Sequence, residues 1–407
     1  FRFNFQRLDA EFALLAYNHN TRILTAARDP WGVRPLFWGR LPNGEGFAFA
    51  SELKAICKIC LEPRQLAPGT FMKVKGGQIL DEVTYRPSLV APTPLLLSAG
   101  EAKREVASRL SRAVEKRLMC QNGGVCCLLS GGLDSSLVAA LAQKHMHPKK
   151  LHTFAVGMPG SPDLKYAQEV ADYIGSKHHG VELDPQQFLD AIPHVIKSIE
   201  SWDVTTVRAS VGNWLIAKYI KENTFFKVVL NGDYSDEIAA GYLYMKMAPD
   251  YEELDRESHR LVNDIHFFDS LRSDRTICAH GLEARTPFAD KEFLTYYMAL
   301  PRPLTSPQGE IEKYLLREAF RDEGLIPDSV LNRRKEAFSD GVSDQKKSWH
   351  HIVQPYLVGQ GHASEAAAYK SFFSRYYSGN EDVIPYKWMP KYCQTQDPSA
   401  RTLAGYY

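Results

Sequence analysis

The sequence predicts an α/β protein in which an antiparallel β layer precedes a parallel sheet covered by helices. Short strands with alternating apolar and polar residues, separated by turn residues, fill roughly the first 86 positions. From Glu101 onward, apolar strand-like runs alternate with segments of helical length, which is the pattern of a parallel sheet. The 407 residues suffice for two or three domains.

The antiparallel layer is predicted from five strands with turn sequences such as "NHN", "PNGEG" and "APGT" between them. The strands are expected at residues 11–18, 21–29, 35–41, 47–52 and 70–77. Three prolines between Arg86 and Glu101 indicate a linker. We therefore expect a first domain at 1–86, a linker at 87–100 and a second domain at 101–407.

The second domain begins with a charged helix that runs from Glu101 to Met119. Strands and helices then alternate, with a strand ending at Leu129, a helix from Ser135, a strand at 151–158, a helix at 163–176, a strand at 178–183, another helix and a strand at 227–230. Beyond about residue 245 the chain is expected to be mostly helical.

A glycine turn in "CCLLSGGLDSSLVAAL", residues 126–141, predicts an anion site. Ser130, Gly131 and Gly132 connect a buried strand to a helix whose free N–H groups and dipole favour a bound phosphate. The turn is no P-loop, because the sequence contains no G-x-x-x-x-G-K-[ST].

Two acidic turns should lie beside this site, since ligands of open α/β sheets bind at the carboxyl ends of the strands. Asp134 follows the first strand, and "NGDYSDE", residues 231–237, follows the strand "KVVL". A carboxylate beside a phosphate chain requires a cation, and magnesium held by one or two carboxylates is the usual solution. We therefore predict that Asp134 and Asp236 bind magnesium. The simpler interpretation of Asp134 is a helix N-cap.

The composition gives no sign of a nucleic-acid or membrane partner and fits a reducing, cytosolic setting. The 49 basic and 48 acidic residues nearly cancel, and no apolar run reaches ~18 residues. Seven cysteines without a repeated spacing argue against a disulfide scaffold, and Cys57 and Cys60 are expected to be ordinary thiols. The first residues do not form a signal peptide, so we expect a cytoplasmic protein.

The pattern S-G-G-x-D-S resembles the pyrophosphate loop of the ATP pyrophosphatases, which cleave ATP to AMP and pyrophosphate. Further motifs narrow the resemblance to the glutamine-hydrolysing asparagine synthetases, and the end "WMPKYCQTQDPSARTL" is similar to that of their eukaryotic members. These motifs are "TFAVGMPGSPDL", "DVTTVRAS", "SDE" with "GYLY", "HGLEARTPFADKEFL" and "RRKEAFSDGV". The resemblance implies an ATP pyrophosphatase-type synthetase domain, ATP and Mg²⁺ as cofactors, and aspartate and ammonia as substrates. A homodimer is the expected assembly.

The resemblance also implies roles for residues in these motifs. In the family the segment with Thr205, Thr206 and Arg208 binds aspartate, and Lys335 would neutralise charge on the separating phosphates. The adenosine-contacting positions correspond to Leu128, Val156, Asn231 and Gly232, and the pyrophosphate loop to Ser130, Gly131, Gly132, Asp134 and Ser135. Without the resemblance, a capped surface helix at Asp203 and a solvated Lys335 are the simpler interpretations.

Two departures from the family pattern stand out. The family begins with a nucleophilic cysteine, whereas "RLDAEFALLAYN", "ARDPWGVRPLFWG" and "ASELKAI" are similar only to the second half of a class II (N-terminal nucleophile) amidotransferase domain. We therefore expect the front half of that domain to be missing and ammonia to replace glutamine, unless a front part is supplied.

The second departure concerns the acidic turn, where the family has "S-G-E-G-S-D-E". The family's catalytic Glu corresponds to Asp233, whose carboxylate reaches about 1.5 Å less far. Tyr234 replaces a glycine and is expected to add bulk near the nucleotide, and Asn231 replaces a serine. The leading hypothesis is an ammonia-dependent asparagine synthetase domain. The alternatives are a weakened paralogue that binds a nucleotide or a partner, and a ligase for another carboxylate.

Overall fold

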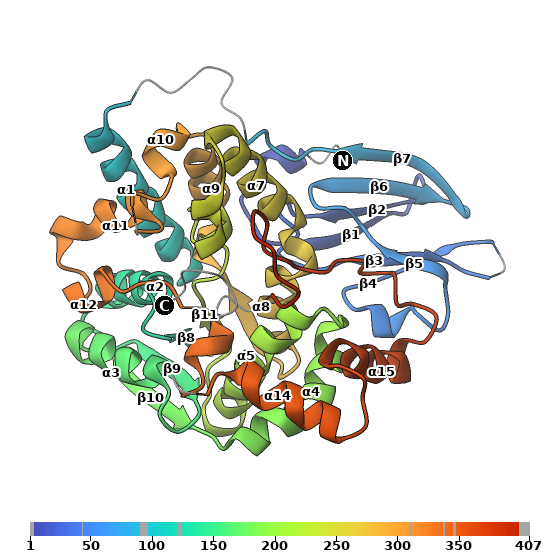
Figure 1. The fold of residues 1–407 in the computed structure, drawn as a ribbon. Coiled ribbons are helices and arrows are strands. Elements are labelled where there is room, and N and C mark those ends of the chain that lie inside the picture. Colours follow the sequence, from blue (N-terminus) through green and yellow to red (C-terminus); the bar gives the residue numbers. More distant parts are fainter. Residues whose placement is uncertain are drawn as a thin grey trace.

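The computed structural model describes residues 4–42, 44–89, 97–119, 124–309, 311–336, 338–344 and 347–398. Figure 1 shows antiparallel strands on one side of the molecule and a parallel sheet surrounded by helices on the other. The fold is therefore the predicted α/β architecture with an antiparallel β layer at its N-terminal end.

The antiparallel layer consists of two small sheets. One sheet has the order β1 (Ala13–Asn18), β2 (Ile23–Arg28), β6 (Thr70–Lys75), β7 (Gln78–Thr84), and the other β4 (Phe47–Ala50), β3 (Phe37–Arg40), β5 (Leu61–Gln65). Their neighbouring strands are antiparallel. The five predicted strands are confirmed, while β5 and β7 were not predicted. Ala26, Trp38 and Met72 belong to the apolar cluster of this layer.

The parallel sheet has five strands in the order β10, β9, β8, β11, β12. Their bounds are Lys177–Glu182, His152–Gly157, Val125–Leu128, Val228–Leu230 and Glu283–Arg285. All neighbouring pairs are parallel, which places the carboxyl ends together at one edge. The predicted strands are confirmed, and β12 was not predicted.

Helices cover both faces of the parallel sheet, because alternate residues of β8 enter different apolar clusters. Val125 and Cys127 pack with residues of α1 and α2, whereas Cys126 packs with residues of α4 and α5. This two-sided burial explains why β8, β9 and β11 are apolar without alternation. The helices are α1 (Ala99–Arg117), α2 (Leu133–Met146), α3 (Pro162–Ile174), α4 (Pro185–Ile199), α5 (Val204–Asn223), α6 (Ser235–Ile238), α7 (Tyr251–Asp264), α8 (Asp269–Cys278), α9 (Lys291–Met298), α10 (Arg302–Thr305), α11 (Tyr314–Phe320), α12 (Asp328–Leu331), α13 (Phe338–Gly341), α14 (Trp349–Gly359) and α15 (Glu365–Tyr377).

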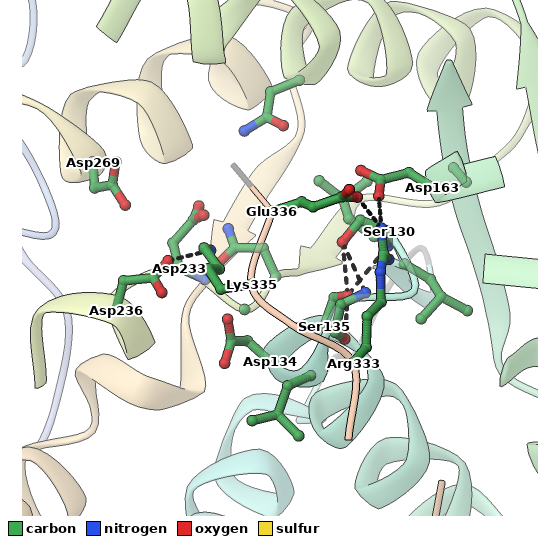
Figure 2. Close-up of a pocket in the computed structure, with 18 of the residues that line it drawn as sticks. Ser130, Asp134, Ser135, Asp163, Asp233, Asp236, Asp269, Arg333, Lys335 and Glu336 are labelled. Atoms are coloured by element: carbon green, nitrogen blue, oxygen red, sulfur yellow. Dashed lines mark hydrogen bonds and ion pairs between the residues drawn. The ribbon is translucent and has the colours of Figure 1, made fainter. Parts of the chain in front are cut away.

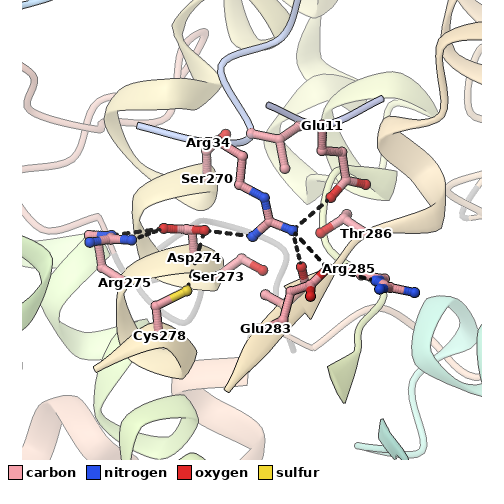
Figure 3. A network of polar contacts seen from close by, with 12 residues as sticks. Glu11, Arg34, Ser270, Ser273, Asp274, Arg275, Cys278, Glu283, Arg285 and Thr286 are labelled. Carbon is pink, nitrogen blue, oxygen red and sulfur yellow. Dashed lines mark hydrogen bonds and ion pairs between the residues drawn. The ribbon is translucent and has the colours of Figure 1, made fainter. Parts of the chain in front are cut away.

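A buried ion-pair network joins the antiparallel layer to the α/β part (Figure 3). The Arg34 guanidinium lies 2.7 Å from Asp274 of α8 and 3.2 Å from Glu11, and it donates to the Ala284 carbonyl in β12 at 2.6 Å. Burial alone would raise the pKa of the Asp274 carboxyl, but Arg275 and Arg34 outweigh it and hold that pKa below its usual value. The network therefore stabilises the charged form of Asp274 at the interface.

The proposed division of the chain at residues 86 and 101 stays a prediction. β7 ends at Thr84, and Ser98 caps α1 by accepting a hydrogen bond from the Glu101 amide. Residues 90–96 of the predicted linker lie outside the described residues. Among the helices that the structure describes, none combines the length and apolar character that a membrane span requires.

Candidate active site

A cleft opens at the carboxyl ends of β8, β9 and β11 (Figure 2). It brings together eleven of the residues predicted from sequence, namely Leu128, Ser130, Gly132, Asp134, Ser135, Val156, Asn231, Gly232, Asp233, Asp236 and Lys335. The lining combines the apolar side chains of Leu128, Phe154 and Val156 with lysines, arginines and carboxylates. Such a mixed lining suits a ligand that has both an apolar ring and anionic groups.

The glycine turn is closed by its own serines and permits a close approach of α3. Ser135 Oγ accepts a hydrogen bond from the Ser130 amide at 3.2 Å and lies 3.1 Å from Ser130 Oγ. Gly131 has φ 71°, and a Cβ there would lie 2.4 Å from Tyr166 Cβ. Only glycine fits this position, and the turn places the N-terminus of α2 at the cleft. Asp134 lies within α2 and is not its N-cap, which is Gly132.

The acidic turn after β11 packs directly against the glycine turn. A Cβ on Gly232 would lie 2.7 Å from the Ser135 amide nitrogen, so the backbones of the two turns approach closely. The Asn231 side chain is buried, and its Oδ1 accepts a hydrogen bond from Thr286 at 3.1 Å. Asn231 therefore contributes to the cleft wall while its amide is held by neighbouring residues.

Tyr234 does not crowd the cleft, contrary to the expectation from sequence. Its side chain is buried within the main apolar cluster, and its hydroxyl hydrogen-bonds to Ser270 of α8. The residue adopts φ 78°, a left-handed conformation that turns the ring away from the residues that line the cleft. The tyrosine side chain, which stands where the family has a glycine, is therefore accommodated in the core.

Two aspartates and two lysines form a charged group at the base of the cleft. Lys335 Nζ lies 2.6 Å from Asp236 Oδ2, and Lys313 Nζ lies 2.7 Å from Asp236 Oδ1 and also contacts Asp134. Burial alone would raise the pKa of Asp236, but both ammonium groups outweigh it and hold that pKa well below its usual range. Burial opposes the charged form of Lys335 as well, yet Asp236 and Asp134 raise its pKa. Asp236 and Lys335 are therefore expected to be charged at neutral pH.

The donor set of this group fits a magnesium ion accompanied by phosphate. Asp134 and Asp236 offer carboxylate oxygens from two adjoining turns, which is the ligand type that magnesium prefers. Within the described residues, no cluster of three or more potential metal-binding side chains occurs. The remaining ligands would therefore have to come from phosphate oxygens and water.

Asp233 lies in the same cleft and is held by an arginine of α8. Its Oδ1 accepts a hydrogen bond from Arg272 at 2.6 Å, and Arg272 also contacts Asp269 at 2.8 Å. Burial and the Asp269 charge raise the pKa of the Asp233 carboxyl, while Arg272 lowers it, and the pKa stays above its usual value. A positioned carboxylate with a raised pKa can accept a proton from a reacting group.

Several cleft residues were not predicted from sequence, and Arg333 links two of them, Asp163 and Glu336, to the glycine turn. It donates to the Gly131 carbonyl at 3.1 Å, to Asp163 at 3.0 Å and to Glu336 at 2.6 Å. Burial raises the pKa of Asp163 to about 6, against the opposing charge of Arg333. Asp163 and Arg333 lie within the quoted motifs "TFAVGMPGSPDL" and "RRKEAFSDGV", and Lys313 lies in the region expected to be mostly helical. The spacing of these residues gave no sign that they would converge.

The predicted aspartate-binding residues Thr205, Thr206 and Arg208 do not line the cleft. Thr206 donates to Asp203, which caps α5 and is buried, and Thr205 approaches the Trp388 carbonyl at 3.5 Å. The Arg208 guanidinium is buried and paired. It lies 2.5 Å from Glu365, 2.9 Å from Asp397 and 2.9 Å from His350 Nδ1.

The five-stranded parallel sheet, the Ser-Gly-Gly turn and the adjoining acidic turn define a synthetase domain of the ATP pyrophosphatase type. Residues 105–250 and 245–397 match the family described as asparagine synthase, and residues 3–58 match a glutamine amidotransferase domain. Glutamine-hydrolysing asparagine synthetases of Gallus gallus and Homo sapiens are each 39% identical over 98% of this chain and 78% of their own length. The enzyme of Pongo abelii is 40% identical with the same coverage. The chain belongs to the asparagine synthetase family.

Proposed function

We propose that the protein is an ATP-dependent ligase that converts aspartate to asparagine through a β-aspartyl-AMP intermediate. The observation that carries the proposal is the convergence of the Ser130–Ser135 turn, two carboxylates and two lysines in one cleft, in a member of the asparagine synthetase family. We also propose residues 1–86 as an amidotransferase layer, 87–100 as a linker and 101–407 as the synthetase domain. A cytoplasmic homodimer remains an expectation.

In the first step, the aspartate side-chain carboxylate attacks the α-phosphorus of ATP, and the bond to pyrophosphate breaks. Leu128 and Val156 would pack against the adenosine, and the glycine turn would bind the phosphates through backbone N–H groups. Lys335 would compensate charge on the departing pyrophosphate. Magnesium held by Asp134 and Asp236 would supply further charge compensation.

In the second step, ammonia attacks the acyl carbon and AMP leaves with its bonding electrons. The nitrogen must lose a proton as the C–N bond forms. Asp233 would accept this proton, because its carboxylate lines the cleft and its pKa is raised by burial. Arg272 would keep the carboxylate in position.

Aspartate binding by Thr205, Thr206 and Arg208 stays a proposal that rests on the family resemblance. Arg208 would have to exchange Glu365 or Asp397 for a substrate carboxylate. The planar guanidinium suits such an exchange, because it forms paired hydrogen bonds with any carboxylate. We propose ammonia as the nitrogen compound that reacts with the intermediate in the cleft.

The test is pyrophosphate release from ATP by the purified chain. We expect release only with magnesium and aspartate together, and asparagine formation when ammonium is added. Glutamine should yield no glutamate. Release that follows another amino acid would refute the substrate assignment, and ATP binding without release would favour a nucleotide-binding protein without turnover.

A further inference from the structure

Lys313 occupies the space between the two carboxylates that are proposed to hold magnesium. Its side chain is only 2% exposed, and its ammonium contacts Asp134 and lies 2.7 Å from Asp236 Oδ1. The backbone of Lys313 has φ 54°, a conformation that residues other than glycine rarely adopt. Gly241 makes room for the lysine, since a Cβ there would lie 2.1 Å from Lys313 Cε.

Protein groups lie against all four oxygens of these carboxylates. Three of the oxygens accept hydrogen bonds, whereas Asp236 Oδ1 accepts none within the described residues and faces the Lys313 ammonium. Asp134 Oδ1 accepts a hydrogen bond from Ser235 Oγ at 2.6 Å, and its Oδ2 contacts Lys313. Asp236 Oδ1 lies beside Lys313, and its Oδ2 accepts a hydrogen bond from Lys335 at 2.6 Å. The two negative charges are thus balanced by two ammonium groups. A divalent cation that entered alone would add two uncompensated positive charges to a buried site, which is costly.

We propose that Lys313 is a built-in competitor of the divalent cation, so that metal and nucleotide must enter the cleft together. The inference rests on the proposed function and assigns Lys313 a positioning role in it. When a polyphosphate enters, its oxygens provide new partners for the ammonium, and the carboxylates become available to the metal. Without a polyphosphate, Lys313 keeps both carboxylates and the cation binds weakly.

The test measures binding of Mn²⁺ alone to the nucleotide-free chain, by the paramagnetic resonance signal of free Mn²⁺. Lys313→Met should bind Mn²⁺ at least about tenfold more tightly than the parent, because one charge–charge contact of a partly buried pair has that order of effect. Lys313→Gln, which keeps a hydrogen-bond donor, should also bind Mn²⁺ more tightly than the parent. Lys103→Met is the matched control, since Lys103 pairs with Glu318 of α11 on the surface at 2.7 Å, and it should bind like the parent.

A double variant and a stability measurement locate the effect. Lys313→Met with Asp134→Asn should lose the gain in Mn²⁺ affinity, because one of the two carboxylates is then neutral. Mn²⁺ should raise the melting temperature of Lys313→Met more than that of the parent, since the ion replaces the missing ammonium. If both Lys313 variants fold only when Mn²⁺ is present, that result also supports the inference.

Mn²⁺ affinity equal to that of the parent in both Lys313 variants would overturn the inference, as would variants that stay unfolded with Mn²⁺. These outcomes are separate from a failure of the proposed function. The parent's aspartate-dependent pyrophosphate release tests the function without reference to Lys313, whereas Mn²⁺ binding to the nucleotide-free chain requires no turnover.

Discussion

Asp233 combines three features of a proton acceptor, namely a position in the cleft, a raised pKa and a fixed orientation through Arg272. Asp233→Ala should lower ammonia-dependent asparagine formation by roughly 100-fold or more, which is the usual contribution of a positioned base. Asp233→Glu should raise the rate, because the longer side chain restores the family's reach. The measurement is asparagine formed per pyrophosphate released, which separates the second step from the first.

Asp269 provides the control for this role, because it shares Arg272 with Asp233 and raises the pKa of Asp233. A base must be ionised, so activity should fall as the pH drops below the pKa of Asp233. Asp269→Asn removes the like charge and should move this acidic limb to lower pH. An Asp233→Ala variant as active as the parent would show that Asp233 has no catalytic role.

Asp163 should make ATP binding depend on pH near 6. Its pKa is raised to about 6 by burial, so the carboxyl gains a proton as the pH falls through that value. The ion pair with Arg333 at 3.0 Å then weakens, and with it the support that Arg333 gives to the Gly131 carbonyl. The KM for ATP should therefore rise below pH ~6. In Asp163→Asn the KM should be high already at pH 8, without this inflection.

The effect of Asp163 on stability has the opposite sign. A folded pKa above the ordinary value of 3.8 means that the folded state binds this proton more tightly than the unfolded chain. Asp163 therefore opposes folding when it is ionised, and this cost disappears as the pH falls from about 6 to below 3.8. An Asp163→Asn variant with the parent's pH profile for KM would exclude Asp163 as the titrating group.

At the residue scale, the sequence predicted the cleft residues that follow strands, and the family resemblance added Lys335, but the other cleft residues of later segments were not predicted. Asp134 and Asp236 were predicted because each follows a strand, and parallel strands end at a common edge. Lys313 lies far along the chain, and its position depends on how α11 packs against α1. The Tyr234 side chain was expected near the nucleotide, but the left-handed backbone conformation of this residue directs the ring into the core.

Tyr234→Gly would remove a buried ring, so it should destabilise the fold by about 3 kcal/mol.

At the element scale, the glycine turn between β8 and α2 depends on one residue without a side chain. Gly131→Ala should weaken ATP binding at least about tenfold, because the new Cβ would lie 2.4 Å from Tyr166 and displace the turn or α3. Gly175→Ala is a matched control with the same φ of 71° and no atom within 4 Å of the new Cβ. Gly175→Ala introduces the strain of a left-handed alanine without a steric clash, so it should bind ATP like the parent. Isothermal titration with a non-hydrolysable ATP analogue gives both affinities, and equal losses in the two variants would contradict the role of the close approach.

The elements that escaped prediction are short or lack an apolar pattern. β12 has three residues, Glu283–Arg285, and gains its place by pairing with β11. β5 has the sequence "LEPRQ", in which a proline and two charged residues hide the strand. The region before β11, where one helix was expected, contains both α4 and α5, separated at a left-handed Glu200. The secondary structure of such segments depends on their contacts with neighbouring elements. A single sequence does not show which elements will be neighbours in the fold.

At the scale of the whole molecule, the Arg34 network fixes the antiparallel layer to the α/β part. Arg34→Met would leave Asp274 and Glu11 with fewer opposing charges in a buried interface. Loss of one partner from a buried pair costs about 3 kcal/mol, so the melting temperature should fall by roughly 5 °C. Arg256→Met is the control, because Arg256 and Glu253 form an exposed pair on α7, and it should shift the melting temperature by less than about 1 °C.

The candidate site as a whole was predictable where the family motifs coincide with strand ends. The predicted aspartate segment departs from this rule, because Thr205, Thr206 and Arg208 belong to the first turns of α5. Asn213 and Ile216, further along that helix, reach the cleft instead. The contacts of Arg208 with Glu365 and Asp397 depend on the arrangement of the C-terminal helices, and no local pattern reveals it.

The pairing of Arg208 with Asp397 gives the protein a tethered analogue of its proposed substrate. A carboxylate that belongs to the same chain acts at a local concentration that, for a short flexible link, is on the order of millimolar. If Arg208 binds aspartate as proposed, free aspartate must outcompete Asp397, so half-saturation should require more aspartate than an unpaired guanidinium would need. Asp397→Ala should therefore lower the KM for aspartate several-fold, whereas Asp382→Ala, in the segment after α15, should not change it. The measurement is a steady-state titration of aspartate. A lower KM in Asp397→Ala would indicate that the chain senses amino-acid supply, whereas an unchanged KM would indicate that the Arg208 cluster serves only the fold.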